Sequence, residues 1–173
     1  MPQALDNGVD SGTDRVITVH EVERLLVREA SLLDQWKLKE WLELLTDDAR
    51  YFVPALDSPD RSHKESIYLI ADTRISLQSR VEQLIGKTAW AESPRSRTRR
   101  LVTNIDILED GGDAATIGAN FAVWRFQHEQ TDVYVGRYEH RIKRVDGALL
   151  IQERRAILDL EVLRPHGKLS FIL

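Results

Sequence analysis

The sequence predicts an α+β domain in which helices come first and long antiparallel strands follow, so that the helices pack on one face of a curved sheet. Apolar residues recur every three or four positions in the early part of the chain and every second position after residue 100. The length of 173 residues, with 42% apolar and 30% charged side chains, is typical of one soluble domain. Residues 1–17 lack periodicity and predict a mobile tail, which leaves residues 18–173 as a single domain.

Three helices are expected in the first part of this domain. The first begins at a capping box formed by Thr18 and Glu21. Its apolar stripe comprises Val22, Leu25, Leu26, Leu33 and Trp36. A second, short helix is indicated by Leu38, Trp41, Leu42 and Leu45. The third helix has Asp72 as its expected N-cap and Gly86 at its C-terminal end. Its apolar stripe comprises Leu77, Val81, Leu84 and Ile85.

Strands are predicted around and after these helices. A strand over residues 50–53 ends at Pro54. A polar loop and a short strand follow, at residues 57–65 and 67–70. Four longer strands are expected at residues 101–108, 114–127, 133–144 and 148–162, with glycine-containing hairpin turns at 109–113 and 145–147. Such long strands must bend to enclose a core, and Gly118 and Gly136 are the predicted kink positions.

The composition excludes several classes of function. The chain has no cysteine, so it cannot form a disulfide, a thiolate nucleophile or a thiolate-held cluster. The five histidines show no spacing typical of a metal site, and no phosphate-binding loop or nucleophile elbow occurs. We therefore expect no catalytic, cofactor-binding or metal-binding residue in this chain. The net charge of −4 argues against nucleic acid, and the absence of an apolar membrane span or secretory signal favours a cytoplasmic protein.

Three aromatic and polar side chains share one face of a predicted strand: Tyr134, Tyr138 and His140. In a stand-alone dehydratase or isomerase, His140 would form an acid–base pair with Asp72 or Asp106. In a small-molecule binding module, the same face would line an apolar pocket of a few hundred cubic ångströms. The preferred interpretation is a protein interface, where aromatic residues with polar ends are enriched.

Glu29 is the one carboxylate on the apolar stripe of the first helix. A buried charge requires a partner, and Arg137 or Arg154 of the sheet is the expected one. We therefore predict a structural ion pair rather than a catalytic acid, and a fully exposed Glu29 would contradict this interpretation.

Arginines gather before the first long strand, at Arg95, Arg97, Arg99 and Arg100. They indicate a solvated or protein-facing patch, because guanidinium groups bind carboxylates across interfaces. The apolar C-terminal residues are expected to dock on the chain's own sheet or on a neighbouring subunit. The residues predicted to contact a partner are Trp90, Arg97, Arg99, Arg100, Tyr134, Tyr138, His140 and Phe171.

Several segments together resemble the small (beta) subunit of Rieske-type aromatic ring-hydroxylating dioxygenases. They are REASLLD (28–34), EWLELLTDDARYFVPA (40–55), TRRLVTNI (98–105), VGRYEHRIKRVDG (135–147) and the apolar C-terminal end. The resemblance covers nearly the whole chain from Val22 to Leu173, and none of these segments is a catalytic signature. Two positions depart from the family pattern: the last hairpin often carries a tryptophan where this chain has Ala148 or Leu149, and His140 is often acidic.

The resemblance implies a nuclear-transport-factor-2-like (cystatin-like) fold with a curved, mostly antiparallel sheet. It further implies assembly with large alpha subunits, commonly as α3β3, with contacts between beta subunits as well. In such enzymes the alpha subunit holds the Rieske 2Fe-2S cluster and the mononuclear Fe(II). The beta subunit is mainly structural and in some members influences substrate preference.

Overall fold

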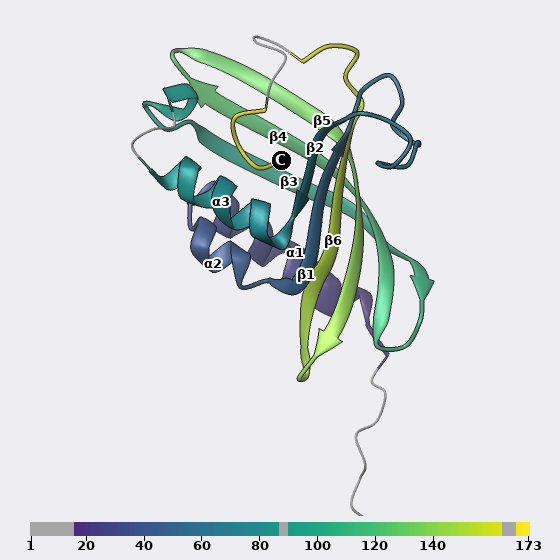
Figure 1. The fold of residues 1–173 in the computed structure, drawn as a ribbon. Coiled ribbons are helices and arrows are strands. Elements are labelled where there is room, and N and C mark those ends of the chain that lie inside the picture. The colour runs from purple at the N-terminus through teal and green to yellow at the C-terminus, as the bar shows by residue number, and fades with distance from the viewer. Residues whose placement is uncertain (1–15, 87–89, 164–168) are drawn as a thin grey trace, which may run out of the picture.

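The computed structural model describes residues 16–86, 90–163 and 169–173. Helices α1 (Val19–Asp34), α2 (Leu38–Leu42) and α3 (Arg74–Ile85) lie on one face of a strongly curved sheet (Figure 1). A short 3-10 helix, η1 (Trp90–Glu92), precedes the long strands. The six strands are β1 (Leu45–Pro54), β2 (Tyr68–Thr73), β3 (Arg97–Asp110), β4 (Ala114–Gln127), β5 (Gln130–Val145) and β6 (Ala148–Leu158).

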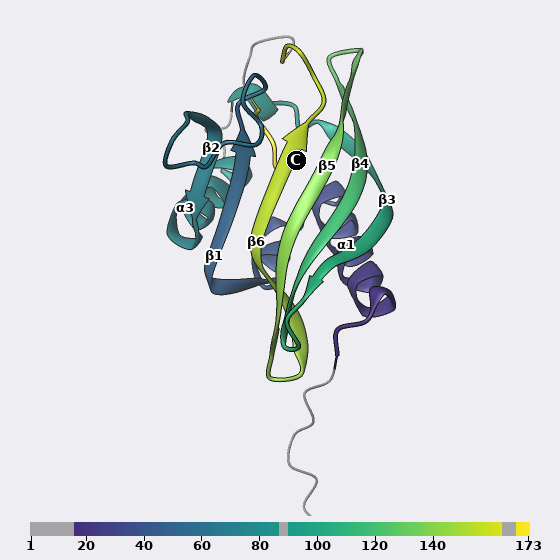
Figure 2. The same ribbon diagram turned by 90° about the vertical axis from the view of Figure 1, so that its right-hand side faces the viewer.

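The strand order is β2-β1-β6-β5-β4-β3, so the first strands of the chain lie beside the last one. Only the β1–β6 pair is parallel among the strand pairs of the described residues. The predicted fold class is confirmed: the sheet is curved and mostly antiparallel, and the helices cover its concave face. None of the helices in the described ranges lies on the opposite face (Figure 2). The core lies between the helices and the concave face.

Irregular pairing and one close strand contact accompany the curvature. In β3 the register with β4 shifts between Thr103 and Asp106, where Asn104 has a positive φ of 53°. Gly136 lies where β5 meets β6 so closely that a Cβ there would be 2.0 Å from the Ile157 carbonyl oxygen. The predicted bulge therefore lies in β3, opposite Gly118, while Gly136 permits a close backbone approach.

Several element boundaries differ from those predicted. The N-cap of α3 is Thr73, whose hydroxyl accepts from the Ser76 amide, and Asp72 instead binds Arg80 at 2.5 Å. β1 begins at Leu45 rather than residue 50, because it gains pairing with β6 across the sheet. β6 ends at Leu158 rather than at residue 162. The Thr18–Glu21 capping box is confirmed.

Most of the predicted tail, residues 1–15, lies outside the described residues. Ile17, which was assigned to the tail, is buried in the core, so the tail boundary is corrected to a more N-terminal position. Of the C-terminal end, residues 164–168 also lie outside the described residues, whereas Phe171, Ile172 and Leu173 are buried in the chain's own core.

Candidate functional site

A charged cluster lies at the centre of the molecule, between α1 and the sheet. Glu29 of α1 accepts hydrogen bonds on Oε1 from Arg154 Nε at 2.8 Å and from Trp41 Nε1 at 3.1 Å. Its other oxygen, Oε2, lies 3.5 Å from His140 Nε2. Glu29, His140 and Arg154 are only 1–3% exposed. The predicted ion pair of Glu29 is confirmed with Arg154, while Arg137 lies elsewhere and binds Asp60 at 3.0 Å.

Electrostatics explain how these charges are tolerated inside the protein. Burial alone would raise the pKa of Glu29, but the charge of Arg154 and the contacts with His140 and Trp41 outweigh it and lower that pKa to about 2. Burial lowers the pKa of His140, although Glu29 opposes this effect, so His140 is neutral at pH 7. The cluster therefore consists of an ionised Glu29–Arg154 pair beside a neutral imidazole.

Tyrosine rings surround the Arg154 guanidinium. Its Cζ atom lies 4.4 Å from the Tyr138 ring centroid and 5.5 Å from that of Tyr51. Such cation–π contacts compensate part of the lost hydration of a buried guanidinium. Burial also raises the pKa of both phenols, which keeps them neutral. The cluster is thus a closed assembly of packed rings around one ion pair.

The predicted acid–base pair of a dehydratase or isomerase does not form. Asp72 is bound to Arg80 on the β2–α3 corner, and Asp106 is exposed on β3. The carboxylate beside His140 is that of Glu29, which Arg154 neutralises. Glu29, His140 and Arg154 are buried in the core, so a substrate cannot reach them unless the domain opens.

The last C-terminal residues pack into the core of the domain. The Leu173 amide donates to Tyr51 Oη at 3.1 Å, and the Phe171 ring packs edge-on against Tyr134 with centroids 5.2 Å apart. Beside Phe171 and Ile172 the remaining cavity measures about 10 Å³, which is about the volume that one water requires. The pocket of several hundred cubic ångströms expected for a small-molecule binding module is therefore absent from this part of the described interior.

A second ion pair connects α1 to β3. Asp34, at the end of α1, accepts from Arg100 Nη1 at 2.5 Å, from the Arg100 amide at 2.9 Å and from Thr98 Oγ1 at 2.9 Å. The other end of the Arg100 guanidinium donates to the Ile172 carbonyl oxygen. Arg100 is therefore a structural residue that holds the helix, the sheet and the C-terminal segment together.

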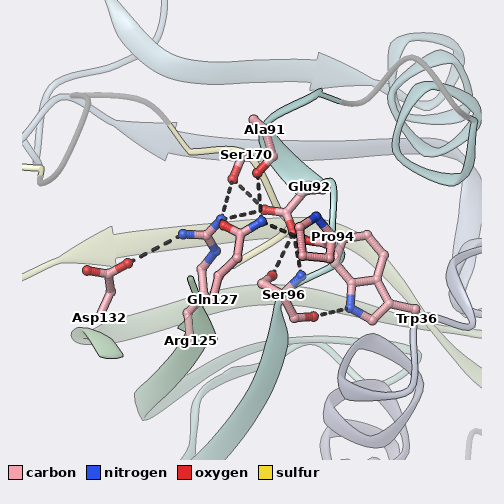
Figure 3. A network of polar contacts seen from close by, with 9 residues as sticks. All are labelled: Trp36, Ala91, Glu92, Pro94, Ser96, Arg125, Gln127, Asp132 and Ser170. Atoms are coloured by element: carbon pink, nitrogen blue, oxygen red, sulfur yellow. Dashed lines mark hydrogen bonds and ion pairs between the residues drawn. The ribbon is translucent and has the colours of Figure 1, made fainter. Parts of the chain in front are cut away.

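A third polar network holds the segment before β3 against the end of β4 (Figure 3). Glu92 accepts from Arg125 Nη2 at 2.9 Å and from Ser170 Oγ at 2.5 Å on one oxygen, and from Ser96 Oγ at 2.6 Å on the other. Gln127 Nε2 donates to the carbonyl oxygens of Ala91 and Pro94 at 3.0 and 2.7 Å. This network, which we name the Glu92 clamp, fixes the backbone from which the exposed arginines of β3 extend.

The residues predicted to contact a partner divide into buried residues, exposed residues and one residue whose side chain is not described. The side chains of five of them are buried within the chain: Arg100, Tyr134, Tyr138, His140 and Phe171. For these five the prediction is corrected, because the concave face on which they lie is covered by the chain's own helices and C-terminal residues. Arg97 and Arg99 are exposed on the opposite face. The side chain of Trp90 lies outside the described residues.

Sequence reasoning missed the Asp34–Arg100 pair and the Glu92 clamp. Their partners are far apart in sequence, so no local spacing connects them. One signal was available for Arg125: it follows Phe121 and Val123 at every second position, and these two point into the core. A charged residue that continues a buried alternation predicts a buried ion pair.

The described residues offer no metal centre. No group of three or more histidine or acidic side chains in the part of the chain that the structure describes comes together in a way that could hold a metal ion. None of the described helices has the length and apolar content that crossing a lipid bilayer requires.

Comparison with known sequences gives a consistent result. Residues 28–165 match the family model described as "Ring hydroxylating beta subunit". The chain is 48% identical to the small oxygenase component of the p-cumate 2,3-dioxygenase system of Pseudomonas putida, over 91% of this chain and 88% of that protein. It is 35% identical to the beta subunit of 3-phenylpropionate/cinnamic acid dioxygenase of Photorhabdus laumondii, over 86% and 88% of the two chains.

Solved structures agree on the fold. A chain of naphthalene 1,2-dioxygenase, determined with indole in its active site, superposes with a TM-score of 0.73 at 25% identity and covers 89% of this chain and 84% of that one. An NTF2-like protein with a cystatin-like fold from Novosphingobium aromaticivorans superposes with a TM-score of 0.58 at 16% identity, over 82% of each chain. The latter likeness concerns the fold alone.

Proposed function

The chain belongs to the ring hydroxylating beta subunit family, and on that premise we propose that it is the non-catalytic subunit that supports assembly of the enzyme. The complex of which it is part is an aromatic ring-hydroxylating dioxygenase, in which a small component of this kind joins a larger alpha subunit. In our proposal the alpha subunit carries the oxidation chemistry, and the present chain holds alpha subunits in position.

The observation that carries this proposal is the sealed ion pair between Glu29 and Arg154. A catalytic acid or base must come within about 3 Å of a substrate atom. Here the carboxylate is bound by Arg154 and Trp41 and is almost fully buried. These contacts suit a residue that stabilises the fold, and burial keeps both Glu29 and His140 out of reach of a substrate.

The iron groups of the enzyme do not fit this chain. A Rieske 2Fe-2S cluster requires two cysteine and two histidine ligands, and the sequence contains no cysteine. A mononuclear Fe(II) site of this type requires two histidines and one carboxylate that converge, and no such group forms among the described residues. We therefore assign both the cluster and the mononuclear iron to the partner alpha subunit.

We further propose an α3β3 assembly in the cytoplasm, with contacts between neighbouring beta subunits. Arg97 and Arg99 are the described residues of the predicted partner interface that remain available for contact with another chain, because both are exposed. The two curated relatives are named for p-cumate and for 3-phenylpropionate or cinnamic acid. All of these are aromatic carboxylates, so we propose an aromatic carboxylate as the substrate class of the complex.

Co-expression with the large subunit of the same enzyme system tests this function. We expect the two chains to purify together, with a native mass equal to three copies of each and with all iron bound to the large subunit. Supplied with O2 and a two-electron reductant, the complex should convert p-cumate to its cis-dihydrodiol, whereas this chain alone should not. Ring hydroxylation by this chain alone, or failure to associate with any iron-containing subunit, would contradict the proposal.

A further inference from the structure

None of the described helices lies on the convex face of the sheet (Figure 2). Near one end, this face carries exposed apolar side chains. We name this surface the convex patch. Its side chains come from three adjacent strands: Leu101 of β3, Ala122, Trp124 and Phe126 of β4, and Val133 and Val135 of β5. The strand register places them in neighbouring rows, because Trp124 pairs with Val133, and Ala122 pairs with both Leu101 and Val135. Four of the six, namely Leu101, Phe126, Val133 and Val135, are 36–51% exposed.

Two arginines continue these rows at the edge of the patch. Arg97 pairs in register with Phe126, and Arg99 pairs with Trp124. Within the described part of the chain neither guanidinium has a hydrogen bond or an ion pair. The two residues are two positions apart on one strand, so their side chains leave the sheet about 7 Å apart.

The other half of the same face has a different character. There the charged side chains bind one another: Arg137 Nε lies 3.8 Å from Glu139, and Arg155 Nε lies 4.0 Å from the same carboxylate. Such mutual pairing is typical of a surface that faces water. The convex patch instead combines apolar area with unpaired guanidinium groups, a combination that is typical of the centre and rim of a protein interface.

The Glu92 clamp fixes the backbone segment beside the convex patch. Gln127, next to Phe126, is bound to the backbone of the segment that precedes Arg97 (Figure 3). A groove of about 330 Å³ lies between that segment and the β4–β5 turn, and Arg97 and Phe126 form part of its wall. Because hydrogen bonds fix the backbone on one side of this groove, we expect a lower entropic cost when a partner side chain enters it.

We propose that the convex patch is the docking surface for the large, iron-bearing subunit of the oxygenase, and that this subunit presents an apolar area with two carboxylates facing Arg97 and Arg99. The inference rests on the proposed function, which supplies the large subunit as partner. Charge complementarity favours the large subunit over a two-fold contact centred on Arg97 and Arg99, because such a contact would bring like-charged guanidinium groups together.

Variants of exposed residues test this surface with little risk to the fold. Leu101→Asp combined with Val135→Asp places charge at the centre of the patch, and Arg97→Glu combined with Arg99→Glu reverses the charge at its edge. Val27→Asp on α1, where the native side chain is 59% exposed, and Arg141→Glu on the far half of the same face are the matched controls. Each variant is co-expressed with the large subunit, and the affinity of the two subunits and the native mass of the complex are measured.

We expect each double variant to weaken the association by at least about tenfold, while each control stays within about twofold of the unchanged chain. The proposal would gain further support if replacing the facing carboxylates of the large subunit with lysine restored its binding to the Arg97→Glu/Arg99→Glu variant. Unchanged affinity for both double variants would overturn it. A one-to-one complex of normal affinity that no longer forms the larger oligomer would also overturn it, since the patch would then bind another beta subunit.

The outcome is separable from that of the proposed function. If the unchanged chain associates with the iron-bearing subunit and both double variants do so equally well, only the location of the docking surface is wrong. If the unchanged chain does not associate at all, the function itself is wrong. Should the aspartate variant lose its cooperative thermal transition, the charge-reversal variant alone decides the matter, because the exposed side chains of Arg97 and Arg99 make no hydrogen bond or ion pair within the described chain.

Discussion

Replacing Glu29 by glutamine should destabilise the protein strongly at neutral pH. The pKa of Glu29 is lowered from 4.5 to about 2. Since a difference of one in pKa is about 1.4 kcal/mol, the ionised carboxylate stabilises the folded state by about 3 kcal/mol. The variant also leaves the buried Arg154 charge without its counter-ion, and breaking a buried pair in this way costs about 3–5 kcal/mol. We therefore expect the free energy of unfolding to fall by roughly 3–5 kcal/mol at pH 7.

The pH dependence of this difference has a definite sign. A carboxyl group with a lowered folded-state pKa stabilises the protein above its unfolded pKa and loses this effect as the pH falls. For Glu29 the loss runs from about pH 4.5 to about pH 2. The unfolding free energies of the variant and the unchanged chain should therefore approach each other over this range, as the unchanged chain loses what the variant already lacks.

Urea unfolding followed by tryptophan fluorescence measures both effects, since the chain contains four tryptophans. Glu23→Gln, an exposed position on the same helix, is the control and should change stability by less than about 0.5 kcal/mol. Combining Glu29→Gln with Arg154→Met should recover much of the loss, because no unpaired charge remains. A Glu29→Gln variant whose unfolding free energy at pH 7 lies within about 0.5 kcal/mol of the unchanged chain would refute the reasoning.

Three further substitutions probe the interior. Burial holds the pKa of His140 below its ordinary 6.5, so the unfolded chain binds a proton there at a higher pH than the folded chain does. The free energy of unfolding should therefore fall as the pH drops below about 6.5. His140→Gln should reduce this fall when urea unfolding is repeated at several pH values, and an equal pH dependence in the variant and the unchanged chain would contradict the reasoning. Gly136→Ala would place a Cβ 2.0 Å from the Ile157 carbonyl oxygen, so we expect loss of the cooperative thermal transition, while Gly118→Ala should keep it; a normal transition in both would count against the close approach. Phe171→Ala should lower the unfolding free energy by about 3–5 kcal/mol, measured by urea unfolding, and a loss below about 1 kcal/mol would show that this ring does not fill the core.

Local patterns in the sequence were enough to predict much of the fold. Alternation located the long strands, and β4 begins and ends where it was predicted. The position of Glu29 on an apolar stripe was enough to predict its burial and its pairing with an arginine of the sheet, which the structure identifies as Arg154 rather than Arg137. In both cases the prediction uses the periodicity of side chains along one helix or strand, which a single sequence displays directly.

Interactions between distant segments explain the errors. The residues before Arg50 join β1 because they lie beside β6, about a hundred positions later in the chain. Tyr138 and His140 were placed correctly on one strand face, but alternation does not tell which face the helices and the C-terminal residues cover. The expected interface on that face was therefore wrong, and the apolar surface that remains exposed lies on the opposite one.

The most direct test of the account compares this chain alone with its complex in one experiment. The chain is purified with and without the large subunit. Iron content, native mass and, with O2 and a two-electron reductant supplied, dihydroxylation of an aromatic carboxylate are measured for both samples. The account predicts no iron and no product for the chain alone, and a hetero-oligomer of fixed stoichiometry in which the large subunit binds all the iron and product forms. Iron bound to the isolated chain, or product formed by it, would contradict the central claim.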